Sequence, residues 1–188
     1  MHNLILKNVS FAYGNESVFD DLSLSFASDS IYLLSAPSGR GKTTLLRLIA
    51  GLIKPKSGEI LGGGIGKVAF AFQDSRLFPS LSALQNASAS ASQSDARDML
   101  FSLGFSEEDL SKLPSELSGG MKQRVSLVRA FLSDAPVLLL DEPFKGLDDN
   151  IRETVYEIIK EKANSKLVIL VSHDLDDAER LAATVVNL

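Results

Sequence analysis

Three runs of this chain are apolar at every position: Ile31–Leu34, Val137–Leu140 and Leu167–Val171. A strand without polar positions is buried on both faces, which is typical of the parallel sheets of α/β proteins. A half-solvated antiparallel strand would instead alternate apolar and polar residues. The three runs therefore predict the central strands of a parallel sheet.

The segments around these runs have helical periodicity, with apolar residues three and four positions apart. The three stripes are Leu45, Leu46, Leu48 and Ile49; Met121, Val125, Val128 and Leu132; and Ile151, Val155, Ile158 and Ile159. Because β and α elements alternate, we expect a doubly wound parallel sheet.

The N-terminal third follows a different pattern. Leu22, Leu24 and Phe26 alternate with serines, which indicates a strand with one solvated face. Leu4–Phe11 is predicted to be an earlier strand, with a turn at Gly14 and Asn15 between the two. An N-terminal antiparallel β subdomain is therefore expected beside the parallel core.

Residues 80–116 interrupt the alternation of strands and helices. Asp95–Leu103 and Glu107–Leu113 are predicted to be helical, and Asn86–Ser94 is an Ala- and Ser-rich stretch that we expect to form a flexible or irregular arm. A plain surface loop of this length would be unusual in a compact domain. We therefore predict a small helical insertion.

Composition limits the class of protein. The 188 residues are 45% hydrophobic and 23% charged with a net charge of −5, as in a globular domain with no electrostatic reason to bind nucleic acid. There is no cysteine, and no apolar run approaches the roughly 20 residues that span a bilayer. Met1-His2-Asn3-Leu4 leads directly into strand-like sequence rather than a secretory leader. A soluble cytosolic protein is expected.

The first apolar run continues into a glycine-rich loop and then a helix, the context of a phosphate-binding P-loop. Lys42 is expected to reach the β- and γ-phosphates of a nucleotide, and the Thr43 hydroxyl to hold Mg²⁺. Ala36 replaces the usual first glycine and would be strained if its φ were positive. The predicted phosphate-binding residues are Ser38, Gly39, Arg40, Gly41, Lys42, Thr43 and Thr44.

The second apolar run ends in a pair of acids, Asp141 and Glu142. Ligand sites in α/β proteins lie at the carboxyl ends of the strands, so both side chains are expected near the phosphate loop. Asp141 is predicted to hold the hydration shell of Mg²⁺, and Glu142 to act as general base on the attacking water.

A second glycine turn, Leu117–Arg124 (Leu-Ser-Gly-Gly-Met-Lys-Gln-Arg), precedes this acidic strand. Ser118 is expected to cap the following helix and leave free N–H groups for an anion. With the P-loop, this string resembles the signature of ABC transporter ATP-binding subunits over nearly the whole chain. The resemblance implies a RecA-like P-loop NTPase core (residues 1–79 and 122–188) and a helical subdomain (80–121) within one domain, 1–188.

The same resemblance assigns roles to the remaining site residues. Tyr13 corresponds to an aromatic that stacks on adenine, although a tyrosine at a strand end is more often a packing residue. Gln73 corresponds to a glutamine that contacts Mg²⁺ and the attacking water, and His173 to a histidine that binds the γ-phosphate. Ser118, Gly119 and Gly120 would bind the γ-phosphate held by an opposite subunit, and Asp148 would contact that subunit. The implied catalytic set is Glu142, His173, Gln73 and Lys42, with Thr43, Gln73 and Asp141 at the metal.

By the same resemblance the chain would bind ATP and Mg²⁺ and hydrolyse ATP in a head-to-tail dimer, either with itself or with a related subunit. It would work on the cytoplasmic face of the cell membrane with an integral membrane permease, in the manner of importer subunits. Leu77 and Phe78 follow Gln73 where the permease docks in the family, and equally suit core positions. A non-transport ABC ATPase of cell division, repair or translation is one alternative, and a small-molecule P-loop kinase another.

Overall fold

The strands form two separate sheets in the computed structural model, which describes residues 3–64 and 66–188. Met1 and His2 of the N-terminal segment lie outside the described residues. The antiparallel sheet has the order β2-β1-β4, with β2 at Glu16–Phe26, β1 at Leu4–Tyr13 and β4 at Ser57–Leu61. The parallel sheet has the order β5-β6-β7-β3-β8, with β5 at Val68–Ala71, β6 at Val137–Asp141, β7 at Leu167–Val171, β3 at Ile31–Ser35 and β8 at Thr184–Asn187.

The apolar runs do form the central strands. All residues of β6 and β7 are buried, and the two strands pair in parallel from Val137 opposite Leu167 onward. Alternate side chains of β6 serve opposite faces of the sheet: Leu138 and Leu140 pack on one side, and Val137 and Leu139 on the other. Burial of both faces explains why these strands contain no polar position before Asp141.

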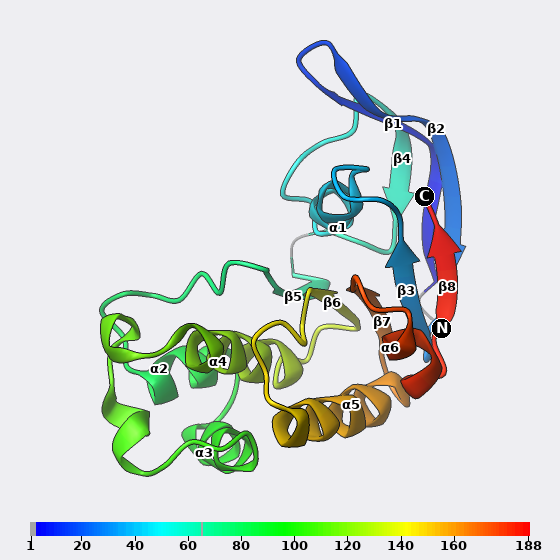
Figure 1. Cartoon of the computed structure of the whole chain (residues 1–188). Helices are drawn as coiled ribbons and strands as arrows, with labels where there is room; N and C mark the ends of the chain where they lie inside the picture. The colour runs from blue at the N-terminus through cyan, green and yellow to red at the C-terminus, as the bar shows by residue number, and fades with distance from the viewer. Residues whose placement is uncertain (1–2, 65) are drawn as a thin grey trace.

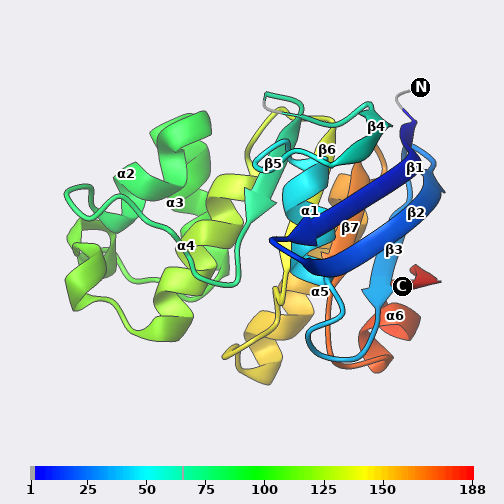
Figure 2. The ribbon, with the colours of Figure 1, turned by 90° about the horizontal axis from the view of Figure 1, so that it is seen from above.

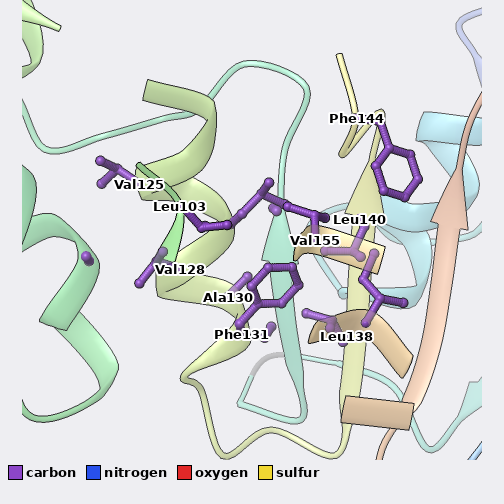
Figure 3. Packing of buried hydrophobic residues seen from close by; sticks show 14 of the residues in the cluster. Leu103, Val125, Val128, Ala130, Phe131, Leu138, Leu140, Phe144 and Val155 are labelled. Carbon is purple, nitrogen blue, oxygen red and sulfur yellow. The ribbon is translucent and has the colours of Figure 1, made fainter. Parts of the chain in front are cut away.

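Helices cover both faces of the parallel sheet (Figures 1 and 2). The helix α1 (Lys42–Ile49) lies between the two sheets and shares a core with Leu4, Phe26 and Leu139. On the opposite face, α4 (Gly119–Phe131) and α5 (Asp149–Ala163) pack on Leu138 and Leu140, as Figure 3 shows. The short α6 (Asp176–Arg180) follows β7.

The predicted helical insertion is present, but its arm is more ordered than expected. The stretch predicted to be irregular contains the end of α2 (Ala83–Ala87), a 3₁₀ turn at Ser88–Ser90 and the start of α3 (Gln93–Ser102). Asn86 explains the difference: its buried amide accepts from Phe78 N–H and donates to the carbonyls of Phe78, Leu81 and Ser82. The prediction of a flexible or irregular arm was therefore wrong.

The second predicted helical piece, Glu107–Leu113, is only a 3₁₀ turn at Glu108–Ser111. Leu113 has φ −77° and ψ 159° because it precedes Pro114, which disfavours helical geometry in the preceding residue. Asp109 accepts hydrogen bonds from Ser106 N–H at 2.8 Å and Lys112 Nζ at 2.6 Å, which stabilise the short turn.

The order of the parallel strands brings three loops together. The strands β6, β7 and β3 are consecutive neighbours, so the loops that follow them open at the same edge of the sheet. These are the phosphate loop after β3, the segment that begins with the acidic pair at the end of β6, and the segment of His173 after β7. Over the described ranges, none of the helices is both long and apolar enough to cross a membrane.

Candidate functional site

The carboxyl edge of the parallel sheet borders a cavity of about 320 Å³. Most residues predicted from the sequence to bind nucleotide or metal, or to act in catalysis, meet there. The lining residues are Tyr13, Glu16, Val18, Ser38, Gly39, Gly41, Lys42, Thr43, Thr44, Gln73, Asp141, Glu142, Val171 and His173. Glu16 and Val18 were not predicted; they come from the N-terminal sheet, and nothing in their local sequence signals a role.

The phosphate loop depends on glycine at two positions, Gly39 with φ +79° and Gly41 with φ +88°. A Cβ on Gly41 would lie 2.5 Å from Cγ1 of Val18, so this position is closed by neighbours as well as by backbone conformation. Ala36 is not among the non-glycine residues with positive φ in the described part of the chain. The departure from the usual glycine therefore causes no backbone strain.

The lysine of the loop is held back against its own backbone. The Nζ of Lys42 donates to the carbonyl of Ala36 at 2.6 Å and is 3.4 Å from that of Pro37. The Lys42 side chain is largely buried, so these two carbonyl oxygens replace the water molecules that would otherwise solvate its ammonium group. Lys42 thus places an ammonium group at the cavity, where an anionic ligand can contact it.

Asp141 and Thr43 form an oxygen-rich corner of the cavity. The Thr43 hydroxyl donates to Oδ2 of Asp141 at 2.8 Å, while the buried Oδ1 has no hydrogen-bond partner. Burial raises the pKa of Asp141, and the hydrogen bond from Thr43 opposes that rise. An unsatisfied carboxylate oxygen beside a hydroxyl suits a hard cation, so these residues fit Mg²⁺.

Glu142 occupies a strained position at the end of β6, with φ +54°. Its N–H donates to the carbonyl of Val171 at 3.0 Å, which fixes this backbone turn against β7. Oε1 of Glu142 lies 3.2 Å from Nε2 of His173 without meeting hydrogen-bond geometry. Burial raises the pKa of Glu142, while His173 acts to lower it. Non-glycine residues with such φ values concentrate at functional sites.

The second glycine turn lies outside this cavity. The Ser118 hydroxyl accepts from Met121 N–H at 3.2 Å and caps α4, and Gly120 sits so close to the loop after β6 that an added Cβ would lie 2.8 Å from the Gly146 carbonyl oxygen. Asp148 caps α5 by accepting from Ile151 N–H at 3.0 Å. The predicted residues that do not line the cavity are Arg40, Ser118, Gly119, Gly120 and Asp148.

Leu77 and Phe78, which equally suited core and surface, have different environments. Leu77 packs against the main core cluster, while Phe78 is 53% exposed. Phe78 borders a groove of about 510 Å³ that also contains Leu52, Phe72 and Arg129. Tyr13 is 48% exposed, its ring meets Phe11 edge-on, and its hydroxyl lies 3.5 Å from Thr44 Oγ1.

A P-loop between a buried strand and helix, facing an acidic strand end, defines an α/β P-loop NTPase. Residues 19–145 match the family described as ABC transporter. The chain is 35% identical to the ergothioneine transport ATP-binding protein EgtV of Helicobacter pylori, over 97% of this chain and 95% of that protein. It is 37% identical to the thiamine import ATP-binding protein ThiQ of Mesorhizobium japonicum, over 97% and 79%.

Among solved structures, the dimeric post-hydrolysis state of the ATP-binding cassette MJ0796 bound to ADP and Pi superposes with a TM-score of 0.85. The two sequences are 27% identical, and the match covers 98% of this chain and 94% of that one. The chain belongs to the ABC transporter family. It is an ATPase of the ATP-binding-subunit type. The resemblance noted in the sequence is confirmed.

Proposed function

We propose that this chain drives solute transport through a separate membrane permease by binding and hydrolysing ATP at the cavity on the sheet edge, with Mg²⁺ as cofactor. The observation that carries the proposal is the convergence of Lys42, Thr43, Asp141, Glu142 and His173 on one cavity, from loops after three neighbouring strands. A positive loop, a hard-cation corner and a raised-pKa carboxylate are what ATP hydrolysis needs.

In this mechanism the loop from Ser38 to Thr44 binds the phosphates of ATP through backbone N–H groups and the start of α1. Lys42 exchanges its contact with the Ala36 carbonyl for the β- and γ-phosphate oxygens. Tyr13 stacks on the adenine; its exposed ring at the rim of the cavity supports this role.

Thr43 and Asp141 would hold Mg²⁺, together with Gln73, which lines the same cavity. When bound, the ion neutralises charge on the phosphate oxygens. Asp141 must be ionised for this task, and positive charge from Arg47 and Lys42 favours the ionised form.

Glu142 then accepts a proton from water as the water oxygen bonds to the γ-phosphorus and the bond to the β-phosphate oxygen breaks, which yields ADP and phosphate. His173 contacts the γ-phosphate, and its position 3.2 Å from Glu142 supports a role at the same reacting group. The raised pKa makes Glu142 a stronger base than an exposed glutamate once it is ionised.

A second subunit completes the site. Ser118, Gly119 and Gly120 do not line the cavity of their own chain, which supports their use on the ATP of a partner, in a head-to-tail homodimer or a pair with a related subunit. The relative MJ0796 is a dimer in its solved structure. Asp148, at the start of α5, would contact that partner.

The transport partner is an integral permease, and the chain would act peripherally on the cytoplasmic face of the membrane. The direction of transport would be import. The helical subdomain (80–121) and the core border the groove at Phe78, where an exposed aromatic supports docking of a permease helix. Two of the relatives are named for transport or import of small solutes, which supports the same reading.

The substitution Glu142→Gln tests the proposal. It removes the base but keeps the shape of the side chain, so ATP binding should persist and ATP with Mg²⁺ should convert the chain to a dimer, measured by light scattering. Glu157→Gln, at an exposed position of α5, should hydrolyse ATP as the wild type does. A Glu142→Gln chain that stays monomeric at saturating ATP and Mg²⁺ would contradict the two-subunit site.

A further inference from the structure

A buried acid lies directly behind the loop that carries His173. Asp177 on α6 is fully buried, and its carboxylate accepts three hydrogen bonds. The donors are Arg152 Nη2 at 2.5 Å and the hydroxyls of Tyr156 and Ser172. Arg152 and Tyr156 come from α5, whereas Ser172 immediately precedes His173.

The residue on the other side of His173 is held by the same group. The carboxylate of Asp174 accepts from Arg152 Nη2 at 3.0 Å and from Asp176 N–H at 3.0 Å, and Asp174 N–H donates to the Ser172 hydroxyl at 3.2 Å. Both neighbours of His173 are therefore fixed, while its own imidazole is largely exposed and faces Glu142.

Arg152 connects this group to two further segments of the site. Its N–H donates to the carbonyl of Asp148 at 2.9 Å in the first turn of α5, and its guanidinium lies 5.5 Å from the ring centre of Phe144, two residues after Glu142. Arg152 and Asp177 line a cavity of about 310 Å³ together with Glu142 and His173. Arg152 and Asp177 thus border the same cavity as the two residues proposed to act in hydrolysis.

Stability alone gives a weak account of this arrangement. Asp177 is fully buried while the Arg152 side chain is 28% exposed, and an apolar group is often at least as stabilising as a charge that must leave water. The hydrogen bond to Asp177 raises the pKa of Arg152, so the guanidinium keeps its charge. What the charged groups supply is orientation: six hydrogen bonds made by Asp177, Asp174 and Ser172 fix the backbone on each side of one imidazole.

We propose that Asp177 and Arg152 are positioning residues for His173. They hold the Ser172–Asp174 loop in the position from which the imidazole contacts the γ-phosphate. They also join that loop to the first turn of α5. This inference rests on the proposed role of His173 in hydrolysis. A misplacement of about 1 Å in a reacting group can cost a hundredfold in rate, so the loop needs such support.

A double-mutant comparison tests the proposal in the full chain with ATP and Mg²⁺. Asp177→Asn should lower kcat roughly tenfold or more, with a smaller change in KM, because the group acts on the reacting geometry. In a His173→Ala background the same substitution should cause no further loss, since there is no imidazole left to position. Additive losses would overturn the proposal and assign Asp177 a general structural role.

A milder variant covers the case in which Asp177→Asn does not fold. Ser172→Ala removes one half-buried hydroxyl just after β7 and should also lower kcat, and Ser172→Thr should restore it. The control is Glu153→Gln, which breaks an exposed ion pair to Arg180 between the same two helices. It should leave kcat unchanged; unchanged kcat in Ser172→Ala as well would overturn the proposal.

Turnover of His173→Ala separates an error in the role of His173 from an error in the positioning network. If His173→Ala retains wild-type turnover, the proposed role of His173 in hydrolysis is wrong. If His173→Ala is inactive while Asp177→Asn and Ser172→Ala turn over normally, the role of His173 stands and the positioning network is wrong.

Discussion

Nε2 of His173 lies 3.2 Å from Oε1 of Glu142, at the ends of the neighbouring strands β7 and β6. The contact falls short of hydrogen-bond geometry, so the buried Oε1 keeps its acceptor capacity. The N–H of Glu142 donates to the Val171 carbonyl, which holds the backbone of Glu142 against the end of β7. The carboxylate of Glu142 and the imidazole of His173 are therefore neighbours that can both still bind a third group.

The rate of hydrolysis should fall at acid pH. Glu142 must be ionised to accept a proton, and burial raises its pKa above the ordinary value of 4.5. Below the midpoint, kcat at saturating ATP and Mg²⁺ should drop about tenfold per pH unit. The measurement is a pH profile of phosphate release, with nucleotide binding followed in parallel to show that the site persists. An acid limb centred at or below 4.5 would contradict this assignment.

Replacement of the loop lysine should nearly abolish turnover. Lys42→Ala removes the ammonium group that donates to the Ala36 carbonyl at the cavity, and with it the charge that would contact the β- and γ-phosphates in the proposed mechanism. We expect kcat to fall at least about a hundredfold, as for other groups that stabilise developing charge. Phosphate release provides the measurement, and Lys54→Ala, at an exposed position, is the control. Wild-type turnover in Lys42→Ala would remove Lys42 from the mechanism.

Loss of the metal-site acid should make the nucleotide-free chain more stable. Folding favours protonated Asp141 because its pKa is raised, so its stabilising contribution exists at acid pH and is lost as pH rises through the folded-state pKa. At neutral pH the ionised, partly unpaired carboxylate opposes folding. Asp141→Asn should gain about 1 kcal/mol in urea unfolding at pH 7 and lose ATP hydrolysis.

The exposed acid Asp134 offers a matched control, because Asp134→Asn removes the same charge from a carboxylate that is not buried. Its unfolding free energy should change by less than about 0.5 kcal/mol. Equal unfolding midpoints for Asp141→Asn and the wild type at pH 7 would show that the Asp141 carboxylate carries no such cost.

The two loop glycines should differ in their tolerance of a methyl group. Gly39→Ala adds only backbone strain, about 1 kcal/mol, because nothing lies near the new Cβ. Gly41→Ala adds overlap with Val18 and Phe19 and should cost roughly 1–3 kcal/mol more. Urea unfolding of both variants measures the difference, and an equal loss would mean that the Val18 side chain moves aside freely.

Local patterns were sufficient for the central strands and for most cavity residues. A fully apolar run such as Val137–Leu140 has only one favourable environment, and a loop that follows it in sequence must open at the strand end. Two of the edge strands, β4 and β8, were not predicted. In β4 only Ile60 is half-buried, and in β8 only Val186, because each pairs on one side alone. Neither gives a periodic signal.

Long-range side-chain pairs account for the rest. Asn86 lies in an Ala- and Ser-rich stretch that indicates disorder, and its order depends on carbonyls of the preceding turn. Asp177 meets Tyr156 and Arg152 across 21 and 25 residues, so no spacing within a motif could indicate the contact. Arg152 and Tyr156 lie one helical turn apart and are hydrogen-bonded, but that spacing alone does not indicate Asp177.

The helix α4 is continuous from Gly119 to Phe131, about 20 Å at 1.5 Å per residue. One end carries the capped glycine turn. Near the other end, Arg129 donates to the carbonyls of Ser75 and Arg76 beside the exposed groove. Because α4 is one continuous helix, we expect a tilt imposed at the groove to move the glycine turn as well.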